Sequence, residues 1–150
     1  MSAADLDDAE DAWAEFLTHA SNIYSKLRAA CYGHPRDWGW YGKKLDERSR
    51  DPLLLYVHKA RNTATHRLED ITVQVKAGRQ RTVAVGIGWV NVRFPNHVRP
   101  LPVTDENGNI YDVPTTHRGF TFGYCEVGVM SHITNKYFQD LIKEAFSRLR

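Results

Sequence analysis

The residues best suited to chemistry in this sequence are Arg61, Asn62 and His66. A guanidinium group can hold a phosphate with two hydrogen bonds and stabilise negative charge that develops on it. A histidine titrates near neutral pH, so it can take the proton of a ribose 2′-hydroxyl or supply one to the leaving 5′-oxygen. The asparagine lies four residues before the histidine, shares its helix face and can orient it. These residue types suit metal-free cleavage of RNA.

A single helix over residues 51–68 is expected to position these side chains. Asp51 supplies an acceptor for the N-cap, and Pro52 suits the first helical position, where the missing N–H has no consequence. Apolar residues then recur at helical spacing and predict one face buried in the core. The residues of that face are Leu53, Val57, Ala60, Ala64 and Leu68.

The helix geometry also predicts a dimer. Arg61 and His66 lie about 140° apart around the axis of a regular helix, so one helix cannot point both side chains squarely into one cleft. Leu55, Asn62 and His66 share a second face, where an apolar residue beside two polar ones suits a contact between two copies of the helix. The long arginine side chain could wrap round the helix, the helix could end near His66, or two copies of the helix could form the cleft together. The second face motivates the last of these, a homodimer.

Arg61, Asn62 and His66 match the signature of the HEPN superfamily, an arginine followed by four to six residues and a histidine, usually with a polar residue directly after the arginine. Together with the stretch Asp51–Asn62, this motif resembles bacterial HEPN-like proteins, over residues 5–68 at most. The resemblance implies a metal-independent endoribonuclease that acts as a homodimer and leaves a 2′,3′-cyclic phosphate. It also implies a toxin or phage-defence role, with an antitoxin or another protein as partner. HEPN domains are helical bundles, and here the C-terminal helix would complete the bundle.

A different interpretation gives the same helix a structural role only. Arg61 would then pair with an acid such as Glu69 or Asp8, and His66 would cap the end of the helix, because such residues on helix flanks are usually structural or solvated. The protein would in that case be a catalytically inert protein–protein interaction module.

Aromatic and basic residues follow the first predicted helix, which spans residues 5–32 and ends before Gly33 and Pro35. Residues 33–42 are interpreted as a connector and residues 43–50 as a charged segment or short helix. The aromatic side chains could stack RNA bases beside the lysines, plug the end of a helical pair in the core, or bind a small ligand. The candidate RNA-binding residues are Trp38, Trp40, Tyr41, Lys43 and Lys44.

The hydrophobic period changes from helical to alternating after residue 70. Residues 71–94 predict a β-hairpin with a turn at residues 77–79, and the prolines of residues 95–102 predict an extended loop. Asn107-Gly108 predicts a second hairpin, because this pair suits a two-residue turn. Another strand is expected near residues 120–129.

The order of these elements is that of one α+β domain over residues 1–150. The helical part covers about residues 5–68, and an antiparallel sheet of about four strands covers about residues 71–130. A C-terminal helix over about residues 134–149 is expected to pack back on the rest.

Composition and charge limit the classes of protein that remain. The net charge is +2, but residues 1–20 hold six acids and no Lys or Arg, so the other 130 residues carry 20 Lys and Arg against 12 Asp and Glu. A basic body of this kind suits a polyanionic partner such as RNA. No apolar run is long enough to predict a membrane span, and the acidic start lacks the apolar region of a secretory signal. We therefore expect a cytoplasmic protein.

Signatures of cofactors and metals are absent from the sequence. There is no glycine-rich phosphate loop, and the seven histidines are spread singly, without zinc spacing. A metal site formed in space by His117, Cys125 and His132 is the one alternative. Otherwise Cys31 and Cys125 are expected to be reduced, partly buried thiols. We therefore expect any catalysis to need no cofactor.

Overall fold

Four helices and eight short strands form the part of the chain that the structure describes. The structure is a computed structural model, and it describes residues 3–66, 70–76, 80–85, 88–93, 96–123 and 126–148. The helices are α1 (Ala3–Cys31), α2 (Pro35–Arg50), α3 (Pro52–His66) and α4 (Val127–Arg148). The strands are β1 (Thr72–Val75), β2 (Gln80–Val85), β3 (Gly88–Arg93), β4 (His97–Pro100), β5 (Val103–Thr104), β6 (Ile110–Tyr111), β7 (Thr116–His117) and β8 (Phe120–Thr121). This mixture of helices and antiparallel strands confirms the predicted α+β class.

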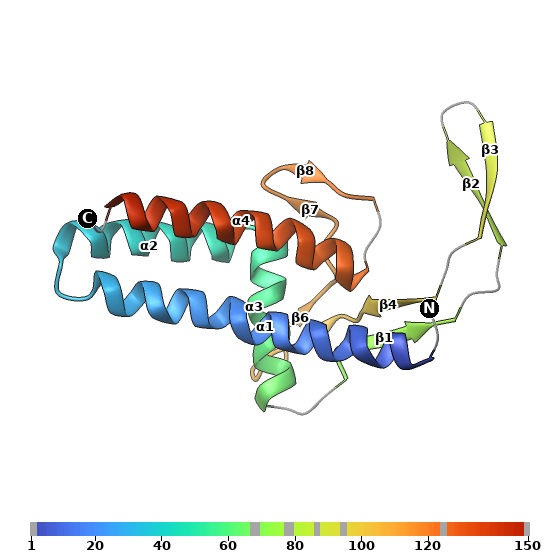
Figure 1. Ribbon diagram of the computed structural model, residues 1–150, viewed down its shortest axis with the longest axis horizontal. Coiled ribbons are helices and arrows are strands. Elements are labelled where there is room, and N and C mark those ends of the chain that lie inside the picture. The colour runs from blue at the N-terminus through green and yellow to red at the C-terminus, as the bar shows by residue number, and fades with distance from the viewer. Residues whose placement is uncertain are drawn as a thin grey trace.

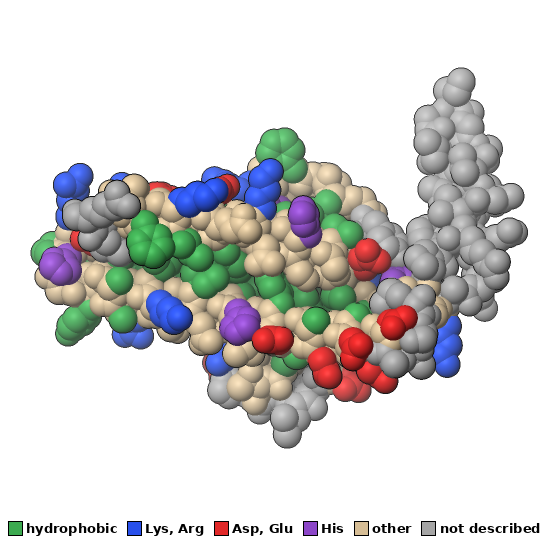
Figure 2. Space-filling view, viewed as in Figure 1, with side chains coloured by type: hydrophobic (Ala, Val, Ile, Leu, Met, Phe, Trp, Pro, Cys, Tyr) green, Lys and Arg blue, Asp and Glu red, His purple; other side chains and the backbone are tan. Residues whose placement is uncertain are grey.

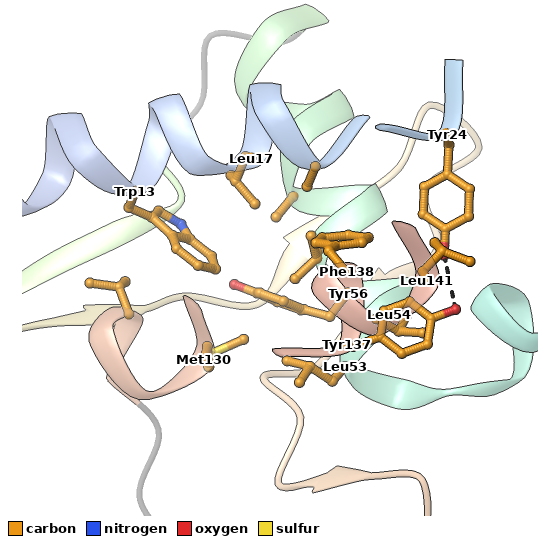
Figure 3. Close-up of a cluster of buried hydrophobic side chains, with 14 of the residues drawn as sticks. Trp13, Leu17, Tyr24, Leu53, Leu54, Tyr56, Met130, Tyr137, Phe138 and Leu141 are labelled. Carbon is orange, nitrogen blue, oxygen red and sulfur yellow. Dashed lines mark hydrogen bonds between the residues drawn. The ribbon is translucent and has the colours of Figure 1, made fainter. Parts of the chain in front are cut away.

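The core lies where α3 crosses the other helices. Helices α1, α2 and α4 run along the long axis of the molecule, and α3 passes across them (Figure 1). Helix α1, predicted over residues 5–32, buries one apolar stripe, with Trp13 and Leu17 only 2% and 1% exposed (Figure 3). The rings of Tyr24 and Phe138 meet edge to face with 6.0 Å between centroids, which joins α1 to α4. Removal of such large apolar surfaces from water is the main force that holds the helices together.

Helix α2 occupies the segment that the sequence predicted as a connector, so that prediction was wrong. Helix α1 ends where Gly33 takes a positive φ of 83°. Pro35 then begins the next helix, at a position that needs no N–H. Trp40 and Tyr41 are each 5% exposed, and burial of these two rings outweighs the low helix propensity of the two glycines nearby. The predicted short helix over residues 43–50 is the second half of α2.

Among the described residues, the antiparallel strands form four separate two-stranded ladders, where the sequence predicted one sheet of about four strands. Strand β1 pairs with β4, from Thr72 opposite Pro100 to Val75 opposite His97, and β2 pairs with β3. The hairpin predicted over residues 71–94 therefore holds only β2 and β3, while β4 forms in the predicted loop. The prolines misled the interpretation, because a proline is tolerated at the end of an edge strand, where no neighbour needs its N–H.

The remaining strands form two small hairpins. Asn107-Gly108 lies in the turn between β5 and β6, as predicted, with a φ of 82° at the glycine. The strand predicted near residues 120–129 is largely wrong, because β8 spans two residues and α4 begins at Val127. The turn predicted at residues 77–79 lies outside the described residues. Buried residues at helical spacing extend α4 back beyond its predicted start, namely Val127, Met130 and Thr134.

Acidic side chains of α1 gather at the end of the molecule beside β1 (Figure 2). Gln74 donates to Asp7 at 2.7 Å and to Glu10 at 3.0 Å. Thr72 donates to the same Glu10 carboxylate at 2.9 Å. Part of the charge asymmetry of the chain therefore has a structural use, because these hydrogen bonds to charged groups attach β1 to the first helix.

Tyr56 connects α3 to the segment before β5, and this contact makes a first prediction. The side chain is 1% exposed, and its hydroxyl donates to the backbone oxygen of Leu101 at 2.6 Å. We expect Tyr56→Phe to lower the free energy of unfolding by about 1 kcal/mol, because the carbonyl loses its partner while the ring stays buried. Urea denaturation at pH 7 measures the change. Tyr32→Phe is the control, since Tyr32 is 76% exposed, and equal effects of the two substitutions would contradict the prediction.

Candidate functional site

Helix α3 begins as the sequence predicted. The backbone N–H of Leu54 donates to Asp51 Oδ1 at 3.0 Å, so Asp51 is the N-cap, and Pro52 is the first helical residue. Leu68 lies outside the described residues. The predicted apolar face packs into the core through Leu53, Val57, Ala60 and the partly buried Ala64.

Arg61 and Asn62 contact each other on this helix. Arg61 Nη1 donates to Asn62 Oδ1 at 3.2 Å, so the asparagine orients the guanidinium group. The Nε atom of Arg61 is buried and has no hydrogen-bond partner among the described residues. His66 is the last residue of α3, and its side chain lies outside the described part of the structure. The prediction that Asn62 orients His66 therefore stays a prediction.

Arg48 of α2 reaches the same place as Arg61, at a small cavity between α1, α2 and α3. The cavity has a volume of about 10 Å³ and is lined by Arg48, His58 and Arg61 together with apolar side chains. It has room for about one water molecule. The guanidinium carbon of Arg48 lies 4.6 Å from the centroid of the Tyr24 ring. Arg48, His58 and Arg61 are termed the basic cluster below.

The two arginines of the basic cluster form no ion pair with an acid in the part of the chain that the structure describes. None of the ion pairs between described residues includes Arg48 or Arg61. The predicted pair of Arg61 with Asp8 is therefore not formed, and Glu69 lies outside the described residues. Lys59, by contrast, is paired with Asp105 at 2.9 Å. Of the cations named here, Arg48 and Arg61 are therefore the two without an ion pair among the described residues.

His58 is a member of the site that the sequence interpretation missed. Burial, together with the positive charges of neighbouring cations, lowers the pKa of this imidazole to about 4. Its ring is therefore neutral at pH 7 and adds no third charge to the two arginines. His58 precedes Arg61 by three positions, so helical spacing alone could have placed both on one flank of the helix.

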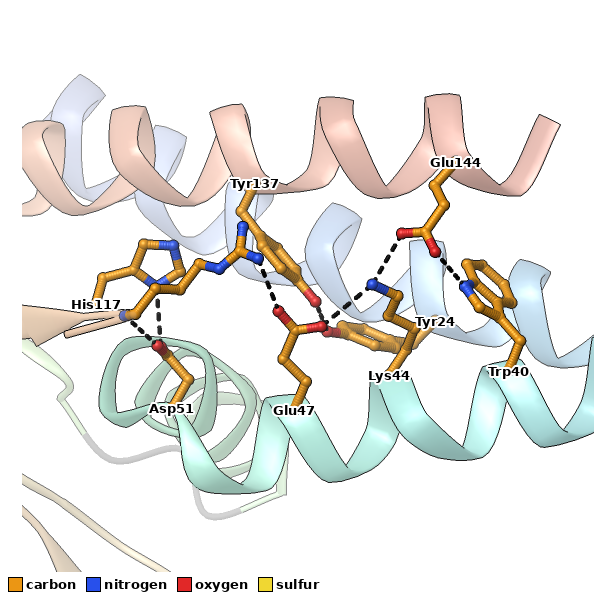
Figure 4. A network of polar contacts seen from close by, with 9 residues as sticks. Tyr24, Trp40, Lys44, Glu47, Asp51, His117, Tyr137 and Glu144 are labelled. Atoms are coloured by element: carbon orange, nitrogen blue, oxygen red, sulfur yellow. Dashed lines mark hydrogen bonds and ion pairs between the residues drawn. The ribbon is translucent and has the colours of Figure 1, made fainter. Parts of the chain in front are cut away.

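The aromatic and lysine platform predicted in residues 38–44 is not available to RNA as a unit. Trp40 and Tyr41 are buried, which supports the alternative that they close the end of a helical pair. Lys44 pairs with Glu144 of α4 at 2.8 Å, and the same carboxylate accepts a hydrogen bond from Trp40 Nε1 at 2.5 Å (Figure 4). The residues that stay exposed are Trp38 and Lys43. The small-ligand interpretation meets the same obstacle, because it needs the buried rings.

A second set of polar contacts joins α3 to the β7–β8 hairpin (Figure 4). His117 Nδ1 lies 3.0 Å from Asp51 Oδ1, and the backbone N–H of Arg118 donates to Asp51 Oδ2 at 2.7 Å. Burial would raise the pKa of Asp51, but the hydrogen bonds from His117 and from two backbone N–H groups outweigh it and lower the pKa below its usual value. Asp51 therefore caps the helix and also anchors the hairpin.

No group of three metal-ligating side chains occurs within the residues that the structure describes. Cys125, which the alternative metal site needs, lies outside them. Cys31 is a buried free thiol. Among the described helices, none is sufficiently long and apolar to cross a membrane.

Comparison of the chain with known proteins gives no match among family models, curated proteins or solved structures. The candidate site is therefore defined by its own residues, the basic cluster with Asn62 beside it.

Proposed function

We propose that this protein binds RNA through the basic cluster and cleaves it without a metal ion. The observation that carries the proposal is that Arg48 and Arg61 line one cavity without an acidic partner among the described residues. Guanidinium groups hold phosphate oxygens with two hydrogen bonds each and remain charged at every physiological pH. A phosphate between them would supply the negative charge that no acid of the described chain provides.

The geometry of Arg61 suits a phosphate at the mouth of the cavity. Arg61 Nη1 already donates to Asn62, whereas the buried Nε atom of Arg61 has no hydrogen-bond partner among the described residues. A buried donor without a partner is unfavourable by about 1–3 kcal/mol. A phosphate oxygen that enters the cavity would accept this N–H, so binding would relieve the penalty. The cavity is too small for a base or a sugar, so the rest of the RNA would lie on the surface.

In the proposed reaction the ribose 2′-hydroxyl attacks the adjacent phosphorus and the bond to the 5′-oxygen breaks. One histidine takes the 2′-hydroxyl proton and another gives a proton to the 5′-oxygen, so the products are a 2′,3′-cyclic phosphate and a 5′-hydroxyl. We assign the proton transfers to His66 of two chains, and the stabilisation of the phosphate to Arg61. The neutral His58 lies beside Arg61 and is a third candidate for proton transfer.

The proposed dimer forms through α3. Leu55 and Asn62 are half-buried and Thr65 is exposed, so the flank of α3 opposite its buried face is still partly open. Contact between this flank in two chains would bring together Arg61, Asn62 and His66 of one chain and the same residues of the other. The proposal places the protein in the cytoplasm, with RNA and a second copy of the chain as its partners.

Cleavage and binding of RNA in EDTA test the proposal. We expect wild-type protein to cleave total RNA, and we expect Arg61→Ala and His66→Ala to abolish cleavage. Arg48→Ala should weaken binding of a fluorescent RNA oligonucleotide by roughly tenfold, because it removes one phosphate contact. The control is Arg50→Gln on the same helix as Arg48, since Arg50 is 77% exposed and paired with Asp46.

Three outcomes would contradict the proposal. They are no cleavage by the wild type, cleavage that needs a metal ion, or cleavage unaffected by Arg61→Ala. Size-exclusion chromatography of Leu55→Asp tests the dimer, because a monomeric mass in both proteins would remove it. Absence of both RNA binding and cleavage would leave the inert interaction module as the better interpretation of α3.

A further inference from the structure

A larger cleft lies between the β7–β8 hairpin and α4, apart from the basic cluster. Its volume is about 650 Å³, within the range of about 300–1,000 Å³ that small-molecule sites usually have. Its lining combines cationic, imidazole and aromatic side chains from the hairpin and the helix with one carboxylate, that of Asp140. Those used below are His117, Arg118, Phe120, His132, Lys136 and Tyr137.

One wall of the cleft is held rigidly. The Asp51 carboxylate binds His117 Nδ1 and the backbone N–H of Arg118, and Asp51 itself is only 7% exposed. The His117 ring also packs edge to face on Tyr137, with centroids 5.8 Å apart. Since the ionised Asp51 accepts the Nδ1 proton, the other ring nitrogen of His117, which Figure 4 shows turned away from Asp51, is left for a ligand.

Arg118 stands in an unusual backbone conformation at the turn of the hairpin. Its φ is 49°, followed by 81° at Gly119, so both central residues of this two-residue turn have positive φ. Such turns favour Asn, Asp or Gly, and an arginine there is strained. Its guanidinium group is 55% exposed and lies 3.5 Å from Glu47. The turn therefore places an exposed cation, ion-paired with Glu47, at the edge of the cleft.

The opposite wall adds a second cation, and the hairpin adds an aromatic surface. Lys136 of α4 is exposed and takes part in none of the ion pairs between described residues. Phe120 is 79% exposed and lies directly opposite His117 in the β7–β8 ladder. Opposite residues of an antiparallel pair project from the same face, so this ring and the imidazole line one side of the cleft.

We propose that this cleft binds a nucleoside phosphate, with the phosphate between Arg118 and Lys136 and the base stacked on Phe120. The free nitrogen of His117 would hydrogen-bond to the phosphate or to a ribose hydroxyl. Cationic side chains can bind the phosphate of a nucleotide, and an aromatic ring can stack on its base. The ligand is either a free nucleotide or one nucleotide unit of an RNA chain. Only the second source depends on the proposed function.

Isothermal titration calorimetry with AMP, GMP, CMP and UMP tests the site, with adenosine and inorganic phosphate as comparison ligands. We expect at least one nucleotide to bind more tightly than either comparison ligand. Arg118→Asn should raise its Kd at least fivefold. Asparagine suits positive φ and keeps the backbone N–H that bonds to Asp51, so the fold should persist.

Two surface variants and one control complete the test. Phe120→Ser and Lys136→Gln should each raise the Kd several-fold, whereas Arg50→Gln should leave it unchanged. Equal binding of nucleotide and phosphate, binding of neither a mononucleotide nor a short RNA, or a Kd unaffected by Arg118→Asn would overturn the proposal. A short RNA that binds the cleft when mononucleotides do not would assign the site to RNA. Nucleotide binding without RNA cleavage would overturn the proposed function alone.

Discussion

Replacement of Asp51 by alanine is expected to lower the free energy of unfolding by about 3–4 kcal/mol. Loss of an N-cap acceptor costs about 1 kcal/mol. Two further hydrogen bonds to the same buried carboxylate, from His117 and from the backbone of Arg118, would also be lost, and each bond to a charged group contributes about 1.5–3 kcal/mol before the structure relaxes. The Arg118 N–H would lose its acceptor within a strained turn. Helix α3 and the β7–β8 hairpin would therefore be weakened together.

Urea denaturation of three variants at pH 7 separates these contributions. Asp51→Asn can still accept the Leu54 N–H, so it should be intermediate between wild type and Asp51→Ala. Asp46→Ala removes an aspartate five residues earlier that is exposed and paired with Arg50. It should change the free energy of unfolding by no more than about 0.5 kcal/mol. If Asp51→Ala were as mild as Asp46→Ala, the anchoring role of Asp51 would be wrong.

Features that depend on neighbours in the chain were predictable from the sequence. The cap at Asp51, the start of α3 at Pro52 and the buried stripe of α1 all follow from local geometry and helical spacing. The Asn107-Gly108 turn is equally local. These elements form in the structure close to where the pattern placed them.

Features that depend on distant partners were not predictable. The two glycines near Trp40 suggest a connector. Only the folded structure shows the Trp40 ring buried beside α4, where Glu144 accepts the indole N–H. Strand β4 exists because β1 pairs with it, and no local pattern contains that pairing. The second role of Asp51 depends on His117, which lies 66 residues further along the chain.

The candidate site shows the same division. Arg61 and Asn62 could be found from their spacing, whereas Arg48 joins them only because α2 folds into a helix beside α3. The sequence interpretation gave Arg48 no place in the site. His58 was passed over because a single histidine has no motif, and its low pKa arises from burial and from charges on two helices.

His58 should make the stability of the protein depend on pH between 7 and 5. Its folded-state pKa of about 4 lies below the ordinary value of 6.5. Between these two values the unfolded chain binds a proton at this histidine that the folded chain does not bind. The contribution of His58 to the free energy of unfolding is therefore fully present above pH 6.5, and it decreases as the pH falls toward 4. From pH 7 to pH 5 we expect a loss of at most about 2 kcal/mol from this group, because solvent screening reduces the effect of a partly exposed imidazole.

Urea denaturation of His58→Gln at pH 7 and pH 5 tests this expectation, because the substitution should remove most of the loss. His19→Gln is the matched control, since His19 is exposed on α1, and it should keep the pH dependence of the wild type. The same dependence in His58→Gln and wild type would contradict the prediction. Part of the low pKa comes from Arg48 and Arg61, so an anion that compensates these arginines should raise the pKa of His58. Phosphate binding at the basic cluster should therefore reduce the pH dependence of stability, which connects this measurement to the proposed contact with RNA.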